Sequence, residues 1–232
     1  MKSDFIGMTR ERYERLYARF LNRSPSELFI IAGGIKGKTV IDLCCGGKRL
    51  TKAAFDAGAE RVLSIDISEE MIGDEWLNNG YIDIVDLGSG FELLSEPANF
   101  LGSGADAVFC QQGVNYWWNN KTVGDIARYM RPDGIFIFNT FNKCPPVIPN
   151  IDVKEYDLGG RKYIETAFTS GIGTVIHLQC CMELDGSDFD SHVSTFEWIP
   201  EYIFRYVLDL YFDDIGYICD GPATVWVARN PK

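Results

Sequence analysis

The sequence predicts an α/β fold with a doubly wound, mostly parallel sheet, a β-rich insertion and a terminal antiparallel hairpin. Up to residue 141, short apolar runs alternate with segments of helical periodicity, as in strand–helix–strand units. Between residues 152 and 198, apolar and polar residues alternate and glycines separate the segments, which indicates antiparallel strands. Two further strand-like runs, joined by Asp220-Gly221-Pro222, predict the closing hairpin.

The expected strands of the parallel sheet are short apolar runs. They lie at residues 39–43, 62–66, 82–85, 105–110 and 135–140. Helices are expected at residues 10–21, 49–57 and 122–130, and a further helix begins at Ser68. Gly58 suits a helix C-cap and Ser68 an N-cap, while Arg131-Pro132-Asp133-Gly134 predicts a turn before the fifth strand.

The second half of the chain has a different pattern. Alternating segments at 162–166 and 174–178, joined by Gly159-Gly160 and Gly171, predict the antiparallel strands of the insertion. Pro200 begins a helix to about Leu210, and the hairpin strands lie at 216–219 and 224–228. The predicted division is therefore residues 1–150 with the N-terminal helix, the insertion at 151–199, and the final helix and hairpin at 200–232.

Size and cysteine content restrict the class of protein. The 232 residues are 46% hydrophobic, which suits one α/β domain with a large core. No apolar run approaches the roughly 20 residues that span a bilayer, and the charged first 20 residues lack the apolar centre of a signal peptide. The seven cysteines form no C-x-x-C spacing, so we expect no metal site and no disulfide framework. A cytoplasmic location is expected.

The charge balance bears on the partners. Acidic residues outnumber basic ones by 33 to 22, for a formal net charge of −11. Nucleic-acid binding depends on Lys and Arg placed against phosphates, and this chain has no surplus of either. We therefore expect neither nucleic acid nor a membrane surface as a partner, but a small molecule.

One motif predicts a ligand site. In VIDLCCGGKRL, residues 40–50, an apolar strand ends in a turn of small residues and a helix follows. Ligands of doubly wound sheets bind beyond the carboxyl ends of the strands, where such a turn lets them approach backbone N–H groups. Asp66 ends the second strand, 20 residues after Gly46, and can accept hydrogen bonds from ribose hydroxyls. Dinucleotides and nucleoside-like cofactors such as S-adenosylmethionine both use this geometry.

Five segments in order resemble the class I S-adenosylmethionine-dependent methyltransferases, over residues 39–141 and the final hairpin. They are VIDLCCGGKRL, VLSIDISEEMI, DIVDL, DAVFCQQGVNYW and RPDGIFIFNTF. The resemblance implies a seven-stranded Rossmann-like sheet. The family's first motif is an acidic residue followed by Gly-x-Gly-x-Gly, of which only Gly46 is kept, with Cys44 and Lys48 at the other positions. A cysteine fits there if its φ is ordinary; Lys48 implies a helical position, weaker cofactor binding or a degenerate site.

The resemblance also implies the residues that bind the cofactor. They are Tyr17, Asp42, Cys44, Gly46, Gly47, Asp66, Ile67, Met71, Asp86, Leu87, Gln111 and Gln112. Gly46 and Gly47 would lie under the methionine part and Asp66 at the ribose, while Asp86 would accept from the adenine amine. Asp42 would hold the loop through backbone N–H groups and contact the cofactor's amino group, and a purely structural role is the alternative. Helix packing is the alternative for Met71, and a solvated loop position is the alternative for Asp86.

The acceptor side is less defined. Residues expected to contact the acceptor are Tyr13, Asn115, Tyr116 and Trp117, since aromatic faces favour a cationic sulfonium. Core packing is the alternative for the tyrosines of the N-terminal helix, and we expect it for Trp118. His192 and Tyr116 are the candidate catalytic residues, and His192 is preferred to His177 because it lies near Glu197 in DSHVSTFEW. The thiols of Cys44 and Cys45 are expected to be inert and buried.

The predicted function is S-adenosylmethionine-dependent methyl transfer to an oxygen or nitrogen atom of a small molecule by in-line displacement. CQQGVNYW after the fourth strand differs from the Asn/Asp-Pro-Pro-Tyr/Phe run of enzymes that methylate nucleic-acid bases. One alternative is a non-catalytic protein that binds S-adenosylmethionine or S-adenosylhomocysteine. Another is a nicotinamide-dependent oxidoreductase, although the dinucleotide glycine pattern is also broken. A monomer or a homodimer is expected.

Overall fold

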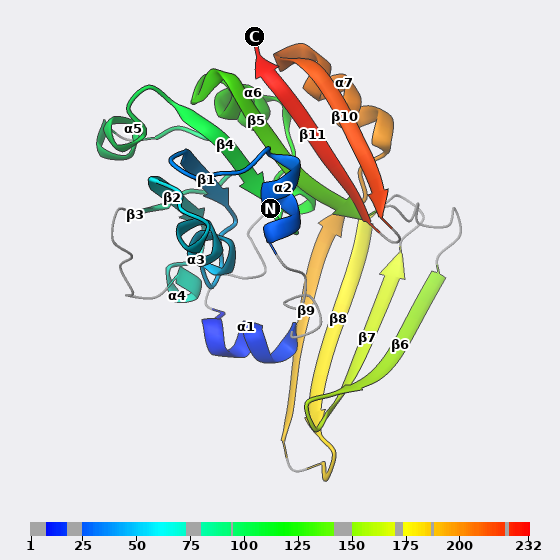
Figure 1. The fold of residues 1–232 in the computed structure, drawn as a ribbon. Helices are drawn as coiled ribbons and strands as arrows, with labels where there is room; N and C mark the ends of the chain where they lie inside the picture. Colours follow the sequence, from blue (N-terminus) through cyan, green and yellow to red (C-terminus); the bar gives the residue numbers. More distant parts are fainter. Residues whose placement is uncertain are drawn as a thin grey trace.

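The structure consists of a seven-stranded mixed sheet flanked by helices and a separate four-stranded antiparallel sheet (Figure 1). This computed structural model describes residues 8–17, 25–72, 80–93, 95–141, 150–169, 174–186, 188–220 and 223–232. The large sheet has the strand order β10-β11-β5-β4-β1-β2-β3, and the small sheet has the order β6-β7-β8-β9. The predicted fold class is confirmed.

The five predicted parallel strands are all present in the large sheet. They are β1 (Thr39–Leu43), β2 (Arg61–Asp66), β3 (Gly80–Ile84), β4 (Ala105–Cys110) and β5 (Met130–Phe141). The strands β10 (Phe212–Asp220) and β11 (Ala223–Pro231) form the antiparallel hairpin, and β11 pairs with β5. The strand order reverses between β1 and β4, so ligands are expected at the carboxyl ends of these two strands.

Helices pack on both faces of the large sheet. One face packs with α5 (Ser95–Leu101), α6 (Asn120–Arg128) and α7 (Glu201–Tyr211), and the other with α2 (Ser26–Ile31) and α3 (Arg49–Asp56). The remaining helices are α1 (Arg10–Leu16), α4 (Glu69–Ile72) and the 3₁₀ turn η2 (Val114–Tyr116). The Ser68 hydroxyl accepts from the amide of Met71, which confirms the predicted N-cap. The short helices α2 and α5 were not expected from the sequence.

The predicted turn at Arg131–Gly134 is wrong, because these residues lie within β5. Ala105 pairs with Met130, whereas Ala107 pairs with Ile135, so the extra residues form a bulge in a continuous strand. A Cβ at Gly134 would lie 2.9 Å from the carbonyl oxygen of Arg131, which explains the need for glycine there. The Pro132-Asp133-Gly134 segment therefore correctly indicated a local bend. It did not mark the start of the strand, because β5 pairs with β4 on both sides of the bulge.

The insertion is the antiparallel sheet β6 (Asn150–Leu158), β7 (Arg161–Thr169), β8 (Thr174–Glu183) and β9 (Phe189–Glu197). Gly159 and Gly160, with φ of 60° and 82°, make the two-residue turn between β6 and β7. The sheet projects from below the carboxyl ends of the parallel strands, and α1 lies beside β8 and β9 (Figure 1). Gly171 and the residues 221–222 of the hairpin turn lie outside the described residues. None of the described helices has the length and apolar character that a membrane crossing requires.

Candidate functional site

The loop between β1 and α3 is built from alternating left-handed residues. Cys44, Gly46 and Lys48 have φ of 56°, 48° and 60°. The two non-glycine residues thus adopt the left-handed backbone that glycine favours, at a strain of about 1–2 kcal/mol each. The expectation that Cys44 has an ordinary negative φ is therefore wrong. The alternative that Lys48 occupies a right-handed helical position is wrong as well. Lys48 lies before α3 as its N-cap, and its side chain is only 1% exposed.

Asp66 joins this loop to the end of β2. Its Oδ2 accepts a hydrogen bond of 2.9 Å from the amide of Gly46, and its Oδ1 accepts one of 3.0 Å from the amide of Ser68. Burial raises the pKa of Asp66, and the backbone amides that surround the carboxylate oppose that rise. Each carboxylate oxygen has a second lone pair that can accept a ligand hydroxyl.

Asp42 is a structural centre beneath the loop. Its Oδ2 accepts a hydrogen bond of 2.6 Å from the hydroxyl of Thr51, which also lies 2.8 Å from the Ser64 hydroxyl. Burial raises the pKa of Asp42 to about 7, although its bonds to Thr51 lower it. These bonds link β1 to α3 and β2, which corresponds to the structural role left open for Asp42 rather than to hydrogen bonds with the loop backbone.

The loop contains two free thiols, of which Cys45 is buried and Cys44 is half-buried. The pKa of Cys44 is raised mainly by a hydrogen bond with Cys110 and secondly by burial. Burial also raises the pKa of Cys45. A raised thiol pKa reduces the thiolate fraction and hence the nucleophilicity at neutral pH. Gly113 packs on Cys44, since a Cβ there would lie 2.5 Å from its Sγ.

The expected adenine side contains both buried and exposed groups. Met71 is buried, and its terminal methyl lies 3.2 Å from the position of a Cβ on Gly46. Asp86 is exposed and accepts from the Gly88 amide and the Ser89 hydroxyl, each at 2.9 Å. Leu87 is a core side chain, and Ile67 is half-buried.

The two residues that follow β4 are held by partners that were not predicted from the sequence. Gln111 accepts a hydrogen bond of 2.8 Å from Arg49, the first residue of α3. Gln112 has a φ of 66°, and its amide donates to the side chain of Asn139 in β5 at 2.7 Å. For Asn139 the available signal was a polar residue near the carboxyl end of an apolar strand.

Helix α1 brings Tyr13 and Tyr17 to this region. Their rings stack with centroids 4.8 Å apart. Burial raises the pKa of Tyr13 to about 12; the charge of Arg49 lowers it, and those of Asp66 and Cys44 raise it further. The phenol of Tyr13 therefore lies near the loop. Gly47 faces Arg10, whose Nε lies 3.2 Å from the position of a Cβ on Gly47.

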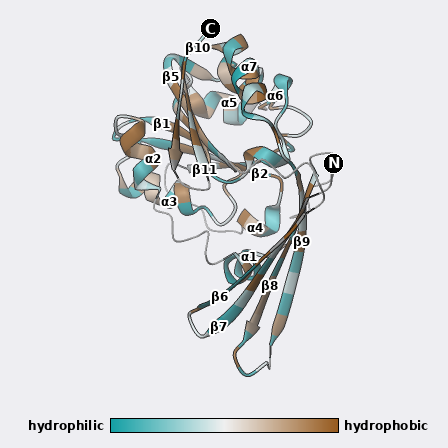
Figure 2. Cartoon of the chain, turned by 90° about the vertical axis from the view of Figure 1, so that its right-hand side faces the viewer, coloured by the Kyte–Doolittle hydropathy of each residue, from teal (hydrophilic) through white to brown (hydrophobic). Residues whose placement is uncertain are grey.

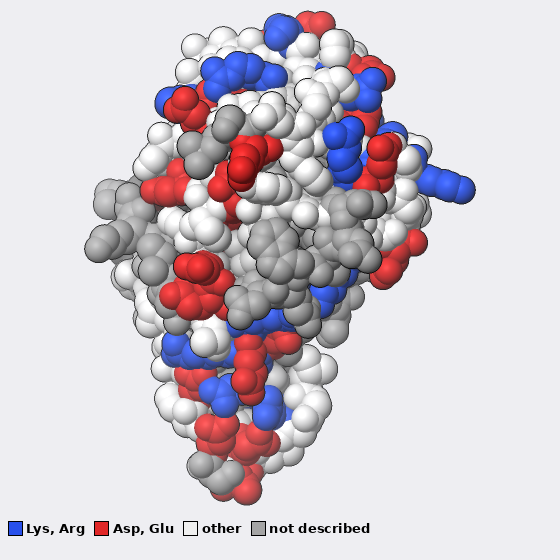
Figure 3. All heavy atoms as spheres, turned by 90° about the vertical axis from the view of Figure 1, so that its left-hand side faces the viewer, with Lys and Arg blue, Asp and Glu red and all other residues white. Residues whose placement is uncertain are grey.

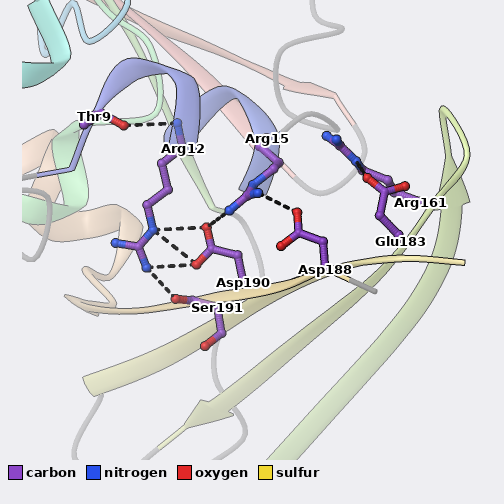
Figure 4. Close-up of polar contacts among 8 residues, drawn as sticks. All are labelled: Thr9, Arg12, Arg15, Arg161, Glu183, Asp188, Asp190 and Ser191. Atoms are coloured by element: carbon purple, nitrogen blue, oxygen red, sulfur yellow. Dashed lines mark hydrogen bonds and ion pairs between the residues drawn. The ribbon is translucent and has the colours of Figure 1, made fainter. Parts of the chain in front are cut away.

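Ion pairs attach α1 to the insertion (Figure 4). Arg12 pairs with Asp190 at 3.0 Å and donates to the carbonyl of Ser191 at 2.8 Å. Arg15 pairs with Asp190 and with Asp188. Partial burial raises the pKa of Asp190, but hydrogen bonds and charges from both arginines outweigh burial and lower it overall.

The predicted catalytic residues His192 and Tyr116 lie at different places: His192 is part of the insertion strand β9, and Tyr116 contacts that strand further along. The hydroxyl of Tyr17 lies 2.7 Å from Nδ1 of His192 in β9. Four residues further along β9, Phe196 contacts the ring of Tyr116 with centroids 5.8 Å apart, and Asn115 donates to the carbonyl of Glu197 at 3.2 Å. The strand β9 therefore contacts α1 at one end and η2 at the other.

The remaining aromatic residues after β4 lie in the core. Trp118 packs on Phe138 and Phe204, which confirms the expected core packing. Trp117 is buried in the same core cluster. His177 pairs with Ser194 across β8 and β9. In the described part of the chain, no group of three or more His, Cys, Asp or Glu side chains is arranged to hold a metal ion.

A doubly wound sheet, a left-handed loop after β1 and a carboxylate at the end of β2 define a protein with a nucleoside-cofactor fold. Residues 41–138 match the family model described as a methyltransferase domain. The match covers less than half of the chain and agrees with the predicted resemblance to class I S-adenosylmethionine-dependent methyltransferases.

The curated relatives agree over a similar length. A ubiquinone biosynthesis O-methyltransferase from Azoarcus sp. is 31% identical over 115 residues, which cover 47% of this chain and 47% of the relative. The corresponding protein from Neisseria meningitidis is 27% identical over 125 residues, or 53% of this chain and 52% of the relative. The chain thus spans about half the length of the curated relatives it matches.

Solved structures agree with the fold over nearly the whole chain. A sugar N-methyltransferase from Streptoalloteichus superimposes with a TM-score of 0.69 at 14% identity, covering 96% of this chain and 92% of the other. An S-adenosylmethionine-dependent methyltransferase from Clostridium acetobutylicum gives 0.68 at 13% identity, with coverage of 94% and 96%. An amino pentose methyltransferase from Micromonospora, solved with S-adenosylmethionine bound, gives 0.65 at 14%, with coverage of 92% and 94%. At such identities the likeness shows the fold.

Proposed function

We propose that this protein transfers a methyl group from S-adenosylmethionine to an oxygen or nitrogen atom of a small molecule. The observation that carries the proposal is the loop at 44–48, whose left-handed residues turn around Gly46 while Asp66 binds the Gly46 amide at 2.9 Å. The methyltransferase-domain match of residues 41–138 supports S-adenosylmethionine rather than a nicotinamide dinucleotide as the cofactor.

The residues present fit this cofactor. Gly46 has no side chain between the loop and Met71, and a Cβ there would crowd the Met71 methyl at 3.2 Å. Asp66 would accept from the ribose hydroxyls, Asp86 from the adenine amine, and Ile67, Met71 and Leu87 would pack on the base. The remaining predicted contacts are Tyr17, Asp42, Cys44, Gly47, Gln111 and Gln112. When bound, the cofactor supplies an electrophilic methyl on a sulfonium.

The chain's own contribution would be positioning and proton removal. In-line displacement requires the acceptor atom at roughly 3 Å from the methyl, and positioning supplies most of the acceleration. Nδ1–H of His192 would donate to the hydroxyl of Tyr17, and in that tautomer Nε2 is the nitrogen that can take a proton from a hydroxyl or ammonium. Tyr13, whose pKa is raised to about 12 chiefly by burial, stays protonated at neutral pH and would donate a hydrogen bond. Asn115, Tyr116 and Trp117 are the proposed acceptor contacts.

Calorimetry with S-adenosylmethionine tests the cofactor assignment. Asp66→Ala should weaken binding by on the order of 100-fold, because it removes an acceptor that the ribose and the loop share. Asp209→Ala, on exposed α7, is the matched control and should bind as the parent does. Unchanged affinity of Asp66→Ala would defeat the assignment. No single substitution among the acceptor contacts should reduce turnover by as large a factor as Asp66→Ala reduces cofactor affinity.

A second candidate follows from Lys48, a fully buried lysine at a left-handed position where the family has glycine. A protein that binds S-adenosylmethionine or S-adenosylhomocysteine without catalysis would keep the affinity and lack turnover. Incubation with labelled cofactor and a panel of phenols, alcohols and amines separates the two, since only the enzyme forms a labelled product.

The acceptor of the methyl group is proposed to be a small molecule. The relatives named above act on oxygen or on nitrogen according to their names, so both acceptor atoms are included in the proposal. Acidic and basic side chains are interspersed on the face drawn in Figure 3, which suits a small acceptor better than nucleic acid. A cytoplasmic location, no membrane partner, a monomeric or homodimeric state and the division at residues 150 and 199 remain predictions.

A further inference from the structure

The side of the insertion sheet that meets α1 carries a row of polar side chains. Directly paired residues of antiparallel strands lie on the same side of a sheet. Gln179 pairs with Glu165 and with His192, so these three side chains form one row across β7, β8 and β9. Tyr17, at the end of α1, contacts the His192 ring and shows which side of the sheet this is. Ser194 lies in the next row on the same side, since polar and apolar segments alternate along β8 and β9 (Figure 2).

Two residues of these rows, Gln179 and Ser194, are buried with unpaired polar groups. Both residues are 0% exposed. Within the described chain, neither the oxygen nor the nitrogen of the Gln179 amide has a hydrogen-bond partner, and the Ser194 hydroxyl has none either. Taking such groups out of water costs free energy that a hydrogen bond normally repays. An apolar side chain of similar size would stabilise the sheet more, so folding alone does not explain these two residues.

The unpaired groups lie between the two elements that contact β9. His192 contacts the end of α1, and Phe196 packs on Tyr116 of η2 with ring centroids 5.8 Å apart. Ser194 lies midway between these contacts, and Gln179 is directly opposite His192. The Cβ atoms of such a cross-strand pair are about 5 Å apart, and residues two apart on one strand are separated by about 7 Å. Gln179 and Ser194 therefore flank the predicted base within the length of one small acceptor.

We propose that Gln179 and Ser194 bind the methyl acceptor through a neutral hydroxyl group next to the atom that is methylated, an assignment that rests on the proposed function. The amide of Gln179 offers two donor hydrogens and an acceptor oxygen, and the Ser194 hydroxyl both donates and accepts, so the pair matches a hydroxyl group, which also does both. Neither side chain is charged, and the neighbouring Glu165 carboxylate already accepts from the Tyr156 hydroxyl at 2.9 Å. A neutral group therefore suits this position better than an ionic one.

The acceptor class that this arrangement selects is a vicinal diol or amino alcohol. One heteroatom would lie at Nε2 of His192 and receive the methyl group, and the hydroxyl on the adjacent carbon would lie at Gln179 and Ser194. An acceptor without that second group would leave the buried amide and hydroxyl unpaired, which is a strong basis for discrimination. Gln179 and Ser194 would thus determine specificity, while proton removal stays with His192.

Binding without turnover tests the assignment first. Calorimetry of the full chain saturated with S-adenosylhomocysteine compares two pairs of probes that differ by one hydroxyl group. They are catechol against phenol, and trans-2-aminocyclohexanol against cyclohexylamine. The hydroxylated member of one pair should bind at least roughly tenfold more tightly than its analogue. The pair that shows the preference distinguishes an aromatic from a saturated acceptor.

Substitution of the two residues should remove this preference. Gln179→Leu and Ser194→Ala should each reduce it by at least about threefold, and the double variant should abolish it, while affinity for S-adenosylhomocysteine stays within about twofold of the parent. Both variants should also raise the melting temperature of the unliganded chain by about 2–4 °C, because each removes a buried unpaired polar group. Ser191→Ala is the matched control on the same strand, since its side chain lies on the opposite side of the sheet, and it should keep the preference.

Three results would overturn the proposal. They are equal affinity within both probe pairs, including no binding of any of the four, a preference that survives the double substitution, and melting temperatures that fall in both variants. The last result would show that the two side chains serve packing.

Labelled S-adenosylmethionine separates this assignment from the proposed function. A chain that prefers the hydroxylated probe in calorimetry but forms no labelled product would contradict methyl transfer and support the binding role of Gln179 and Ser194. A chain that methylates both members of each pair with equal kcat/KM would support methyl transfer and overturn that role.

Discussion

The hydroxyl of Tyr17 lies 2.7 Å from Nδ1 of His192, and this contact joins residues 175 positions apart in the sequence. Tyr17 follows the last residue of α1, and His192 lies in the insertion strand β9. The N-terminal helix and the insertion therefore meet beside the loop at the carboxyl end of β1. The geometry of the predicted catalytic histidine depends on how firmly α1 is docked.

Asp190→Asn should loosen α1, because Asp190 accepts hydrogen bonds from Arg12 and Arg15. Loss of one charge-assisted contact of about 1.5 kcal/mol should raise amide exchange across residues 10–16 roughly tenfold. Hydrogen–deuterium exchange measures this effect. Asp188→Asn is the control, because Asp188 is half exposed and its pair with Arg15 should contribute little. Equal exchange in the two variants would contradict the prediction.

The same contact predicts a pH dependence. The pKa of Asp190 is lowered in the folded state, so its contribution to stability is present above the unfolded value of about 3.9. That contribution is lost as the pH falls through the folded pKa. The parent should thus lose more stability than Asp190→Asn below about pH 4.

Asp42 should have the opposite effect. Burial raises its folded pKa to about 7, so the stability associated with its proton is complete below about pH 4 and is lost as the pH rises toward 7. Asp42→Asn remains neutral and can still accept from Thr51. Between pH 5 and pH 8, the parent should lose on the order of 2 kcal/mol relative to this variant. Melting temperatures at both pH values measure the difference, and parallel curves would refute it.

Lys48 offers a test of backbone strain. Lys48→Gly and Lys48→Ala lose the same buried contacts, but only alanine keeps a Cβ at a φ of 60°. The glycine variant should therefore be more stable than the alanine variant by about 1 kcal/mol in urea unfolding. At Lys52, inside α3, the order should reverse because glycine is a poor helix former. The same order at both positions would contradict left-handed strain.

Two buried serines provide a matched pair for hydrogen bonding. Ser64 lies 2.8 Å from the hydroxyl of Thr51, whereas the hydroxyl of Ser194 has no hydrogen-bond partner within the described chain. Ser64→Ala should destabilise the protein by about 1 kcal/mol, and Ser194→Ala should stabilise it by a similar amount, because an unpaired buried hydroxyl is costly. Calorimetric unfolding of both variants distinguishes the two signs. Destabilisation by Ser194→Ala would show that its hydroxyl is paired.

Local pattern was enough to predict the strands and much of the site. Buried parallel strands are apolar along their whole length, so runs such as 39–43 and 105–110 were visible without tertiary information. The bulge at Arg131–Gly134 was not visible, because pairing with β4 keeps those residues in a strand despite their turn composition. The helices α2 and α5 have six and seven residues, too few for a clear helical period.

The loop at residues 44–48 was also predicted in part: its position was correct, and its backbone conformation was not. The sequence located the loop and its partner Asp66, because small residues after a strand and a carboxylate 20 positions on form a local pattern. It assigned the wrong conformations to Cys44 and Lys48, since intrinsic preference disfavours left-handed cysteine and lysine and the surrounding fold overrides it. Arg49 and Asn139 were missed because their partners, Gln111 and Gln112, are distant in the sequence and follow β4.

By itself, the sequence determined the α/β class, the order of the strands along the chain and the position of the ligand loop. These follow from hydrophobic periodicity and turn chemistry, which act between near neighbours. Only the tertiary structure decided that α1 docks on β9, that Tyr17 meets His192, and that Gln179 and Ser194 are buried beside it without hydrogen-bond partners in the described chain. Those relationships depend on which distant segments share a surface, and short-range residue preferences carry no information about that choice.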